Sequence, residues 1–132
     1  MSGKKNIVFL HGLLCDARFW RAQIGAIETD FPGKFEMHSP ALPASANMAG
    51  VVEEIIGNAP AKFILAGHSL GGYVALELMA TAPERVSALI LANTSATVDG
   101  TDTIGYRRKM VETVRAGKFE TVYKRTINAL AS

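Results

Sequence analysis

Short apolar runs alternate with amphipathic stretches through the first 92 residues of the chain. The runs are too short for helices and contain valine, isoleucine, leucine and phenylalanine, which is typical of strands buried on both faces of a parallel sheet. They occupy residues 6–10, 62–66 and 86–92, and a weaker signal predicts a further strand over residues 34–38. Helical spacing predicts helices over residues 17–30, 47–58 and 71–82. This alternation predicts an α/β fold of three layers, with a mostly parallel sheet of about four strands between helices.

Polar residues mark where two of these helices begin. Asp16 precedes the first helix and Asn47 the second, and both residue types accept hydrogen bonds from the free amides of a helix N-terminus. Apolar residues lie within four positions of Asp16 in the sequence, among them Trp20 and Cys15. We expect Trp20 in the core, because large aromatic side chains dominate cores, and Cys15 as a small buried hydrophobe.

The last quarter of the chain is predicted to be helical, without strands. Residues 103–116 and 119–131 show helical spacing and are separated by Gly117. We therefore divide the chain into a strand–helix core, residues 1–100, and a helical segment, residues 101–132. The second part carries seven basic and three acidic side chains, a bias that we interpret as a solvated face.

Composition excludes several classes of protein. The 132 residues are 48% hydrophobic and 20% charged with a net charge of +2, which excludes a disordered or collagen-like chain and gives no reason to expect nucleic acid. A single cysteine excludes an intramolecular disulfide and a cysteine-based zinc site. The polar start is followed by only four apolar residues, so we expect no signal peptide, no membrane partner and a cytoplasmic location.

A G-x-S-x-G motif occupies residues 67–71, directly between the third strand and the third helix. This context is typical of a nucleophile elbow, which holds its serine, here Ser69, above the carboxyl edge of the sheet. Gly67 and Gly71 lack Cβ atoms, so the strand and the helix can approach closely. The stretch fits neither common phosphate-binding loop, because no lysine follows it and serine stands where a dinucleotide loop needs glycine.

Backbone amides near this motif are suited to an anion. The Leu70 amide begins a helix, where negative charge is stabilised. The first strand ends in His11 and Gly12, followed by Leu13. With this HG turn and the GHSLGG elbow on neighbouring strands, residues 5–95 resemble the N-terminal half of the α/β-hydrolase superfamily, in its serine esterase and lipase-like form.

The resemblance implies a function and a role for each motif residue. Ser69 would hydrolyse a carboxylic ester, lactone or thioester through an acyl-enzyme, with a small apolar acyl group as substrate and no cofactor or metal. Leu13 and Leu70 would donate the oxyanion-hole amides. His11 would shape the oxyanion loop. Independently of the resemblance, we expect His68 to pack or hydrogen-bond under the elbow, because adjacent residues on a tight turn point apart. Residues 101–132 would begin the family's helical lid.

The histidines of the chain do not follow the family's order, which is serine, then acid, then histidine. His11, His38 and His68 all precede Ser69. We therefore expect a chain that lacks the triad acid and histidine and is inactive alone, since an unassisted serine is a poor nucleophile. A truncated product, a proteolytic fragment and a natural short form all fit this expectation.

The alternative function is a non-catalytic half-domain that self-associates or binds a partner chain or small ligand. In this interpretation the strand Val86–Ala92 has one unpaired edge with free N–H and C=O groups. We expect self-association through that edge, with pairing across a two-fold axis.

Overall fold

A computed structural model describes residues 3–131 of the chain. The chain divides between residues 96 and 97 into two compact units, a strand–helix unit and a helical unit.

The elements of the first unit alternate between strand and helix, as the sequence pattern predicts. They are β1 (Lys5–Leu10), α1 (Arg21–Asp30), β2 (Phe35–His38), α2 (Met48–Asn58), β3 (Phe63–His68), α3 (Leu70–Thr81), the short 3₁₀ turn Pro83–Arg85 and β4 (Val86–Ala92). The α/β class and the four strands are confirmed. Helices α2 and α3 lie within one residue of their predicted bounds, and their buried apolar residues pack with those of β1 and β3.

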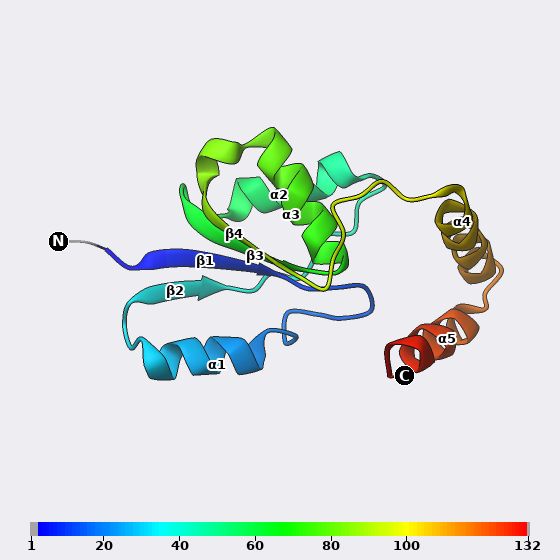
Figure 1. The fold of residues 1–132 in the computed structure, drawn as a ribbon, viewed down its shortest axis with the longest axis horizontal. Helices are drawn as coiled ribbons and strands as arrows, with labels where there is room; N and C mark the ends of the chain where they lie inside the picture. The colour runs from blue at the N-terminus through cyan, green and yellow to red at the C-terminus, as the bar shows by residue number, and fades with distance from the viewer. Residues whose placement is uncertain (1–2, 132) are drawn as a thin grey trace. The chain divides into compact units, whose positions relative to one another are not determined.

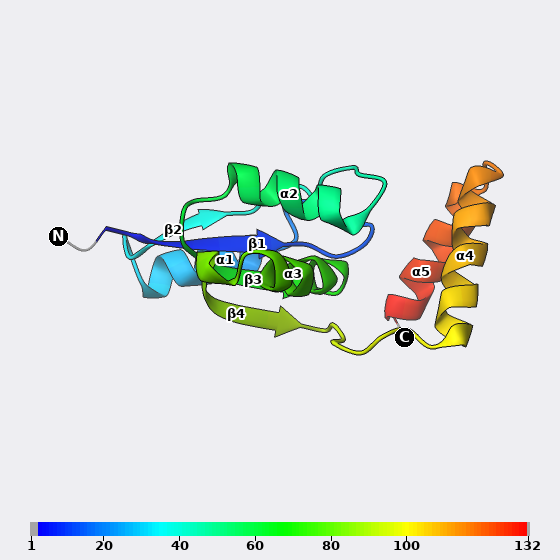
Figure 2. The same cartoon turned by 90° about the horizontal axis from the view of Figure 1, so that it is seen from above.

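The four strands form one parallel sheet in the order β2-β1-β3-β4. Figure 2 shows the arrows of β1, β2 and β4 running in the same direction. The register places Leu10 opposite Gly67 and His68 opposite Ala92. Because β1 and β3 are neighbours, the turns that follow them lie side by side at the carboxyl edge of the sheet.

Alternating strand residues build a core on each face of the sheet. Val8 and Leu10 pack with residues of α2 and α3, whereas Ile7 and Phe9 pack on the opposite face with Trp20 and α1. Figure 1 shows α1 on one side of the strands and α2 and α3 on the other. The three predicted layers are therefore present.

Trp20 lies in the core, as expected, and its indole N–H donates to the Leu10 carbonyl at 3.2 Å. Cys15 contradicts its prediction, because it is exposed. It lies on the loop between β1 and α1, where its thiol contacts the Leu13 carbonyl at 3.5 Å rather than core side chains.

The two predicted helix caps have different outcomes. The Asn47 side chain accepts from the Gly50 amide at 2.9 Å and caps α2, as predicted. Asp16 does not cap α1, because that helix begins at Arg21 and not at residue 17. Its carboxylate accepts from the Arg18 amide at 2.8 Å, which holds a local turn instead.

The second unit consists of two helices, α4 (Thr101–Arg115) and α5 (Phe119–Ala131). Gly117 separates them at a φ of +80°, where glycine adopts the left-handed conformation without a steric penalty. Val122 of α5 is buried. Among the described helices, none has the length and apolar character to cross a membrane.

Candidate active site

Ser69 occupies a strained turn between β3 and α3. Its φ is 50° and its ψ is −114°, a region that residues other than glycine rarely adopt. Strand β3 continues to His68, two residues further than predicted, and α3 begins at Leu70. The serine is therefore the single residue that joins strand to helix, as an elbow requires.

Glycines allow the backbone to close around this turn. A Cβ on Gly67 would lie 2.5 Å from the Gly71 carbonyl oxygen, and a Cβ on Gly71 would overlap the Leu10 carbonyl oxygen. Both contacts involve backbone atoms, which cannot rotate away. The two motif glycines thus let β1, β3 and α3 meet at one point.

The strand next to the elbow also holds it. The Ser69 amide donates to the Ala92 carbonyl at 3.1 Å. Beyond β4, the Thr94 hydroxyl donates to the Ser69 carbonyl at 2.8 Å. Sequence reasoning missed Thr94, and the only signal was its position just after a predicted strand. These bonds keep the Ser69 backbone in its unusual conformation.

The loop after β1 lies against the elbow. A Cβ on Gly12 would lie 2.8 Å from His68 Nδ1 and 3.3 Å from Ser69 Cβ, so the two turns are in contact. Leu13, the next residue, is 46% exposed. The structure therefore brings the predicted HG turn and the elbow together.

His11 is buried and tied to backbone on both sides. Its Nε2 accepts from the Leu42 amide at 3.0 Å, and its Nδ1 contacts the Gly12 carbonyl at 2.9 Å. These partners assign the ring proton to Nδ1, which then donates to the carbonyl. Both nitrogens are occupied, so His11 braces two loops and has no nitrogen free to act as a base.

His68 lies under the turn in an aromatic environment. Its ring stacks on Phe19 with 4.3 Å between centroids and meets Trp20 edge-on at 6.5 Å. Its Nδ1 is buried with no hydrogen-bond partner among the described residues. Burial lowers the pKa of His68 below its ordinary value, because desolvation disfavours the charged ring.

Among residues 3–131, no histidine nitrogen hydrogen-bonds the Ser69 hydroxyl. His11 is engaged by backbone, His38 contacts Asn6 Oδ1 at 3.1 Å, and His68 Nδ1 has no partner. The same part of the chain contains no cluster of three side chains suited to a metal. The hydrogen bonds of His11 and His38 thus lead to Gly12, Leu42 and Asn6 and not to Ser69.

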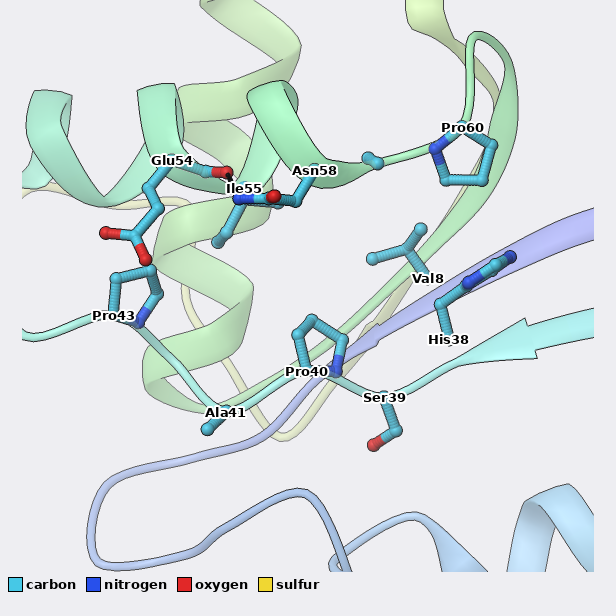
Figure 3. A pocket seen from close by; sticks show the side chains of 11 residues that line it. Val8, His38, Ser39, Pro40, Ala41, Pro43, Glu54, Ile55, Asn58 and Pro60 are labelled. Carbon is cyan, nitrogen blue, oxygen red and sulfur yellow. Dashed lines mark hydrogen bonds between the residues drawn. The ribbon is translucent and has the colours of Figure 1, made fainter.

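A hollow of about 390 Å³ lies elsewhere in this unit. Figure 3 shows Pro40 and Pro43 at its wall, Glu54 on α2 and His38 at the end of β2. None of the elbow or HG-turn residues lines it. This hollow is therefore separate from the candidate active site.

Similar solved structures are esterases and other hydrolases. A thermophilic esterase from Thermogutta terrifontis has a TM-score of 0.73 at 24% identity, over 96% of this chain and 51% of that one. A carboxylesterase from Nitrososphaera gargenis has a TM-score of 0.72 at 15% identity, over 94% of this chain and 51% of that one. An extracellular alpha/beta-hydrolase from a Paenibacillus species has a TM-score of 0.62 at 20% identity, over 83% and 52%.

At these identities the likeness shows the shared fold. The chain spans about half the length of these structures. A separate comparison of the sequence with protein families matches residues 7–128 to the model of one family. The chain belongs to the alpha/beta hydrolase family.

Proposed function

We propose that Ser69 is the nucleophile of a serine hydrolase that cleaves carboxylic esters, lactones or thioesters with small apolar acyl groups. The observation that carries the proposal is the strained conformation of Ser69 between β3 and α3, with the HG turn packed against it. Esterases among the similar folds support the choice of ester bonds. Backbone strain of this kind persists where surrounding structure enforces it and is common at active sites.

The chemistry follows the acyl-enzyme route. Ser69 Oγ attacks the carbonyl carbon of the ester and gives its proton to a general base. The carbonyl oxygen becomes an oxyanion that accepts hydrogen bonds from the amides of Leu13 and Leu70. The C–O bond to the alcohol then breaks as the base returns the proton to the leaving oxygen, and water hydrolyses the acyl-Ser69 ester by the same steps.

The base in this proposal is a histidine, oriented by a carboxylate, that lies outside the described residues. The hydrogen bonds of His11 and His38, together with the burial of His68 Nδ1, support this assignment. Removal of triad members from a serine protease leaves roughly 10³–10⁴-fold catalysis over water, from binding and the oxyanion hole. We expect the rate enhancement by the 132-residue chain alone not to exceed that residual value.

Covalent labelling with a fluorophosphonate, followed by intact and peptide mass spectrometry, tests the assignment. We expect a single slow adduct on the peptide that contains Ser69, absent from Ser69→Ala. The exposed serine of β4 provides a matched control, because Ser87→Ala should label like the unaltered chain. An adduct that survives in Ser69→Ala, or labelling spread over several serines, would refute a nucleophilic role. Rapid stoichiometric labelling would instead show that the chain holds its own base.

A second candidate, a half-domain that self-associates, is favoured by the position of β4. This strand is at one end of the sheet order, and its Ile90 and Leu91 side chains are 49% and 40% exposed. An unpaired apolar edge is a template for pairing with another chain. We expect dimers in sedimentation at micromolar concentration, lost in Leu91→Lys and kept in Glu36→Lys on the opposite edge strand β2. Monomers under these conditions would count against this candidate.

A further inference from the structure

We propose that His68 is a positioning residue whose ring clamps the loop of residues 11–20 against the elbow. The inference rests on the proposed function, because that loop would carry the Leu13 amide toward the oxyanion. His68 would not touch the substrate. It would hold the loop in place through the contacts that its ring makes with aromatic side chains and with a glycine.

Three contacts fix the ring from different directions. One face stacks on Phe19, whose ring is inclined by 28° to the imidazole. The edge meets Trp20, which is anchored in the core by Phe9 at 5.3 Å. The Nδ1 side lies against Gly12, where any side chain would come within 2.8 Å. The ring is thus a shared wall between the loop and the end of β3.

The position of His68 in the chain links its ring contacts to the groups proposed to act on the substrate. Ser69 follows it directly, so a movement of the ring changes the end of β3 and the start of the elbow. On the opposite side, Gly12 directly precedes Leu13. The ring of His68 and its contact Gly12 therefore directly precede Ser69 and Leu13 in the chain.

The neutral form is the one that these contacts favour. Nδ1 is buried without a partner, and burial lowers the pKa of the ring. On the loop packed against it, Asp16 is paired with Arg18 at 2.7 Å and His11 is held by backbone. Cys15 on the same loop and Tyr73 and Glu77 on α3 complete the titratable groups of these elements. No salt bridge of the described residues compensates a proton on His68.

Acidification should therefore loosen the clamp. A second proton would place an uncompensated charge between Phe19 and Gly12, and the loop would move to hydrate it. The transition should be centred below pH 6.5, the ordinary pKa of histidine.

The lone cysteine gives a site-specific test of loop mobility. A nitroxide on exposed Cys15 reports the motion of the loop by electron paramagnetic resonance. At pH 7.5 we expect an immobilised spectrum for the unaltered chain and for Phe19→Tyr, which keeps the stacked ring. Phe19→Ala and His68→Ala should lose the immobilised component. Phe31→Ala is the matched control, since Phe31 is a half-exposed ring that meets Phe35 edge-on at 6.0 Å, away from this loop.

The pH profile separates a clamp from general loosening. The immobilised component of the unaltered chain should disappear on acidification below pH 6.5, and His68→Ala should be mobile at every pH. An unchanged spectrum in Phe19→Ala would overturn the inference, as would an acid transition that persists in His68→Ala. If His68→Ala fails to fold, Phe19→Ala against Phe19→Tyr decides alone. Failure of Ser69 labelling would refute the proposed function and leave these spectra interpretable.

Discussion

Gly71→Ala is the sharpest test of how the elbow is packed. The new methyl group would overlap the Leu10 carbonyl oxygen and lie 2.6 Å from the His11 carbonyl oxygen. These are backbone atoms at the end of β1, so no rotamer change relieves the overlap. Overpacking of a well-packed core costs about 1–3 kcal/mol, and this site has less freedom than a side-chain contact. We therefore expect the free energy of unfolding to fall by at least that amount.

Gly25→Ala gives the matched control, because it makes the same chemical change in a helix. Nothing lies within 4 Å of a Cβ on Gly25 in α1. Alanine in a helix interior is more stable than glycine by roughly 0.5–1 kcal/mol. Gly25→Ala should therefore stabilise the chain, and the two variants should differ by about 1.5–4 kcal/mol.

Urea unfolding followed by the fluorescence of Trp20, the single tryptophan, measures both variants. With m-values of about 1–3 kcal/mol/M, their midpoints should be separated by on the order of 1 M. Far-ultraviolet circular dichroism should give the same midpoints if unfolding is two-state. A Gly71→Ala midpoint at or above that of the unaltered chain would mean that β1, β3 and α3 do not meet as closely as described.

Three further predictions concern single contacts. Asn47→Ala should lower the free energy of unfolding by about 1 kcal/mol in urea, because α2 loses its cap; no change would refute the cap. Thr94→Val should lower the free energy of unfolding by about 0.5–1.5 kcal/mol. We expect a value near the lower bound, because the Ser69 carbonyl still accepts from amides of α3. The Asp16 carboxyl should titrate by nuclear magnetic resonance with a pKa of about 2, and Arg18→Gln should return it toward 3.8. Because the folded pKa is the lower one, this pair stabilises the fold above pH 3.8 and loses its effect as the pH falls toward 2.

The strands were predictable because their signal is local. Residues 6–10 and 86–92 are continuous apolar runs, and both are strands within one residue of the predicted bounds. The end of β3 was not predictable in this way. Gly67 and His68 are not typical strand residues, and they join the ladder because β4 offers Leu91 and Ala92 as partners.

The residue at which each helix begins depended on which backbone amide the preceding polar side chain bonded. The Asn47 side chain accepts from the Gly50 amide and caps α2. Asp16 had Arg18 two residues away and bonds both its amide and its guanidinium, so the helical spacing of Phe19 and Trp20 did not extend α1 to residue 17. Apolar periodicity describes which face is buried and does not show where the backbone bonds begin.

Within the candidate site, the sequence indicated the motif residues and missed their supports. Gly67, Ser69 and Gly71 form a contiguous pattern whose strand and helix context is visible in the chain. The Thr94 bond spans 25 residues, and the Phe19–His68 stack joins the loop after β1 to the end of β3. Such contacts depend on strand order, which local patterns do not specify.

The supports of Ser69 imply that its position and its activation are separable properties. Its positive φ, which costs of order 1–3 kcal/mol, is held by the Ala92 carbonyl, the Thr94 hydroxyl and the closeness that Gly71 permits. All of these belong to residues 3–96, and none is a general base. Under the proposed function, this unit sets the geometry of Ser69 and a histidine from elsewhere removes its proton. The rate at which Ser69 of this chain is labelled measures the contribution of geometry alone to its reactivity. Any increase in that rate on adding a histidine from elsewhere measures activation.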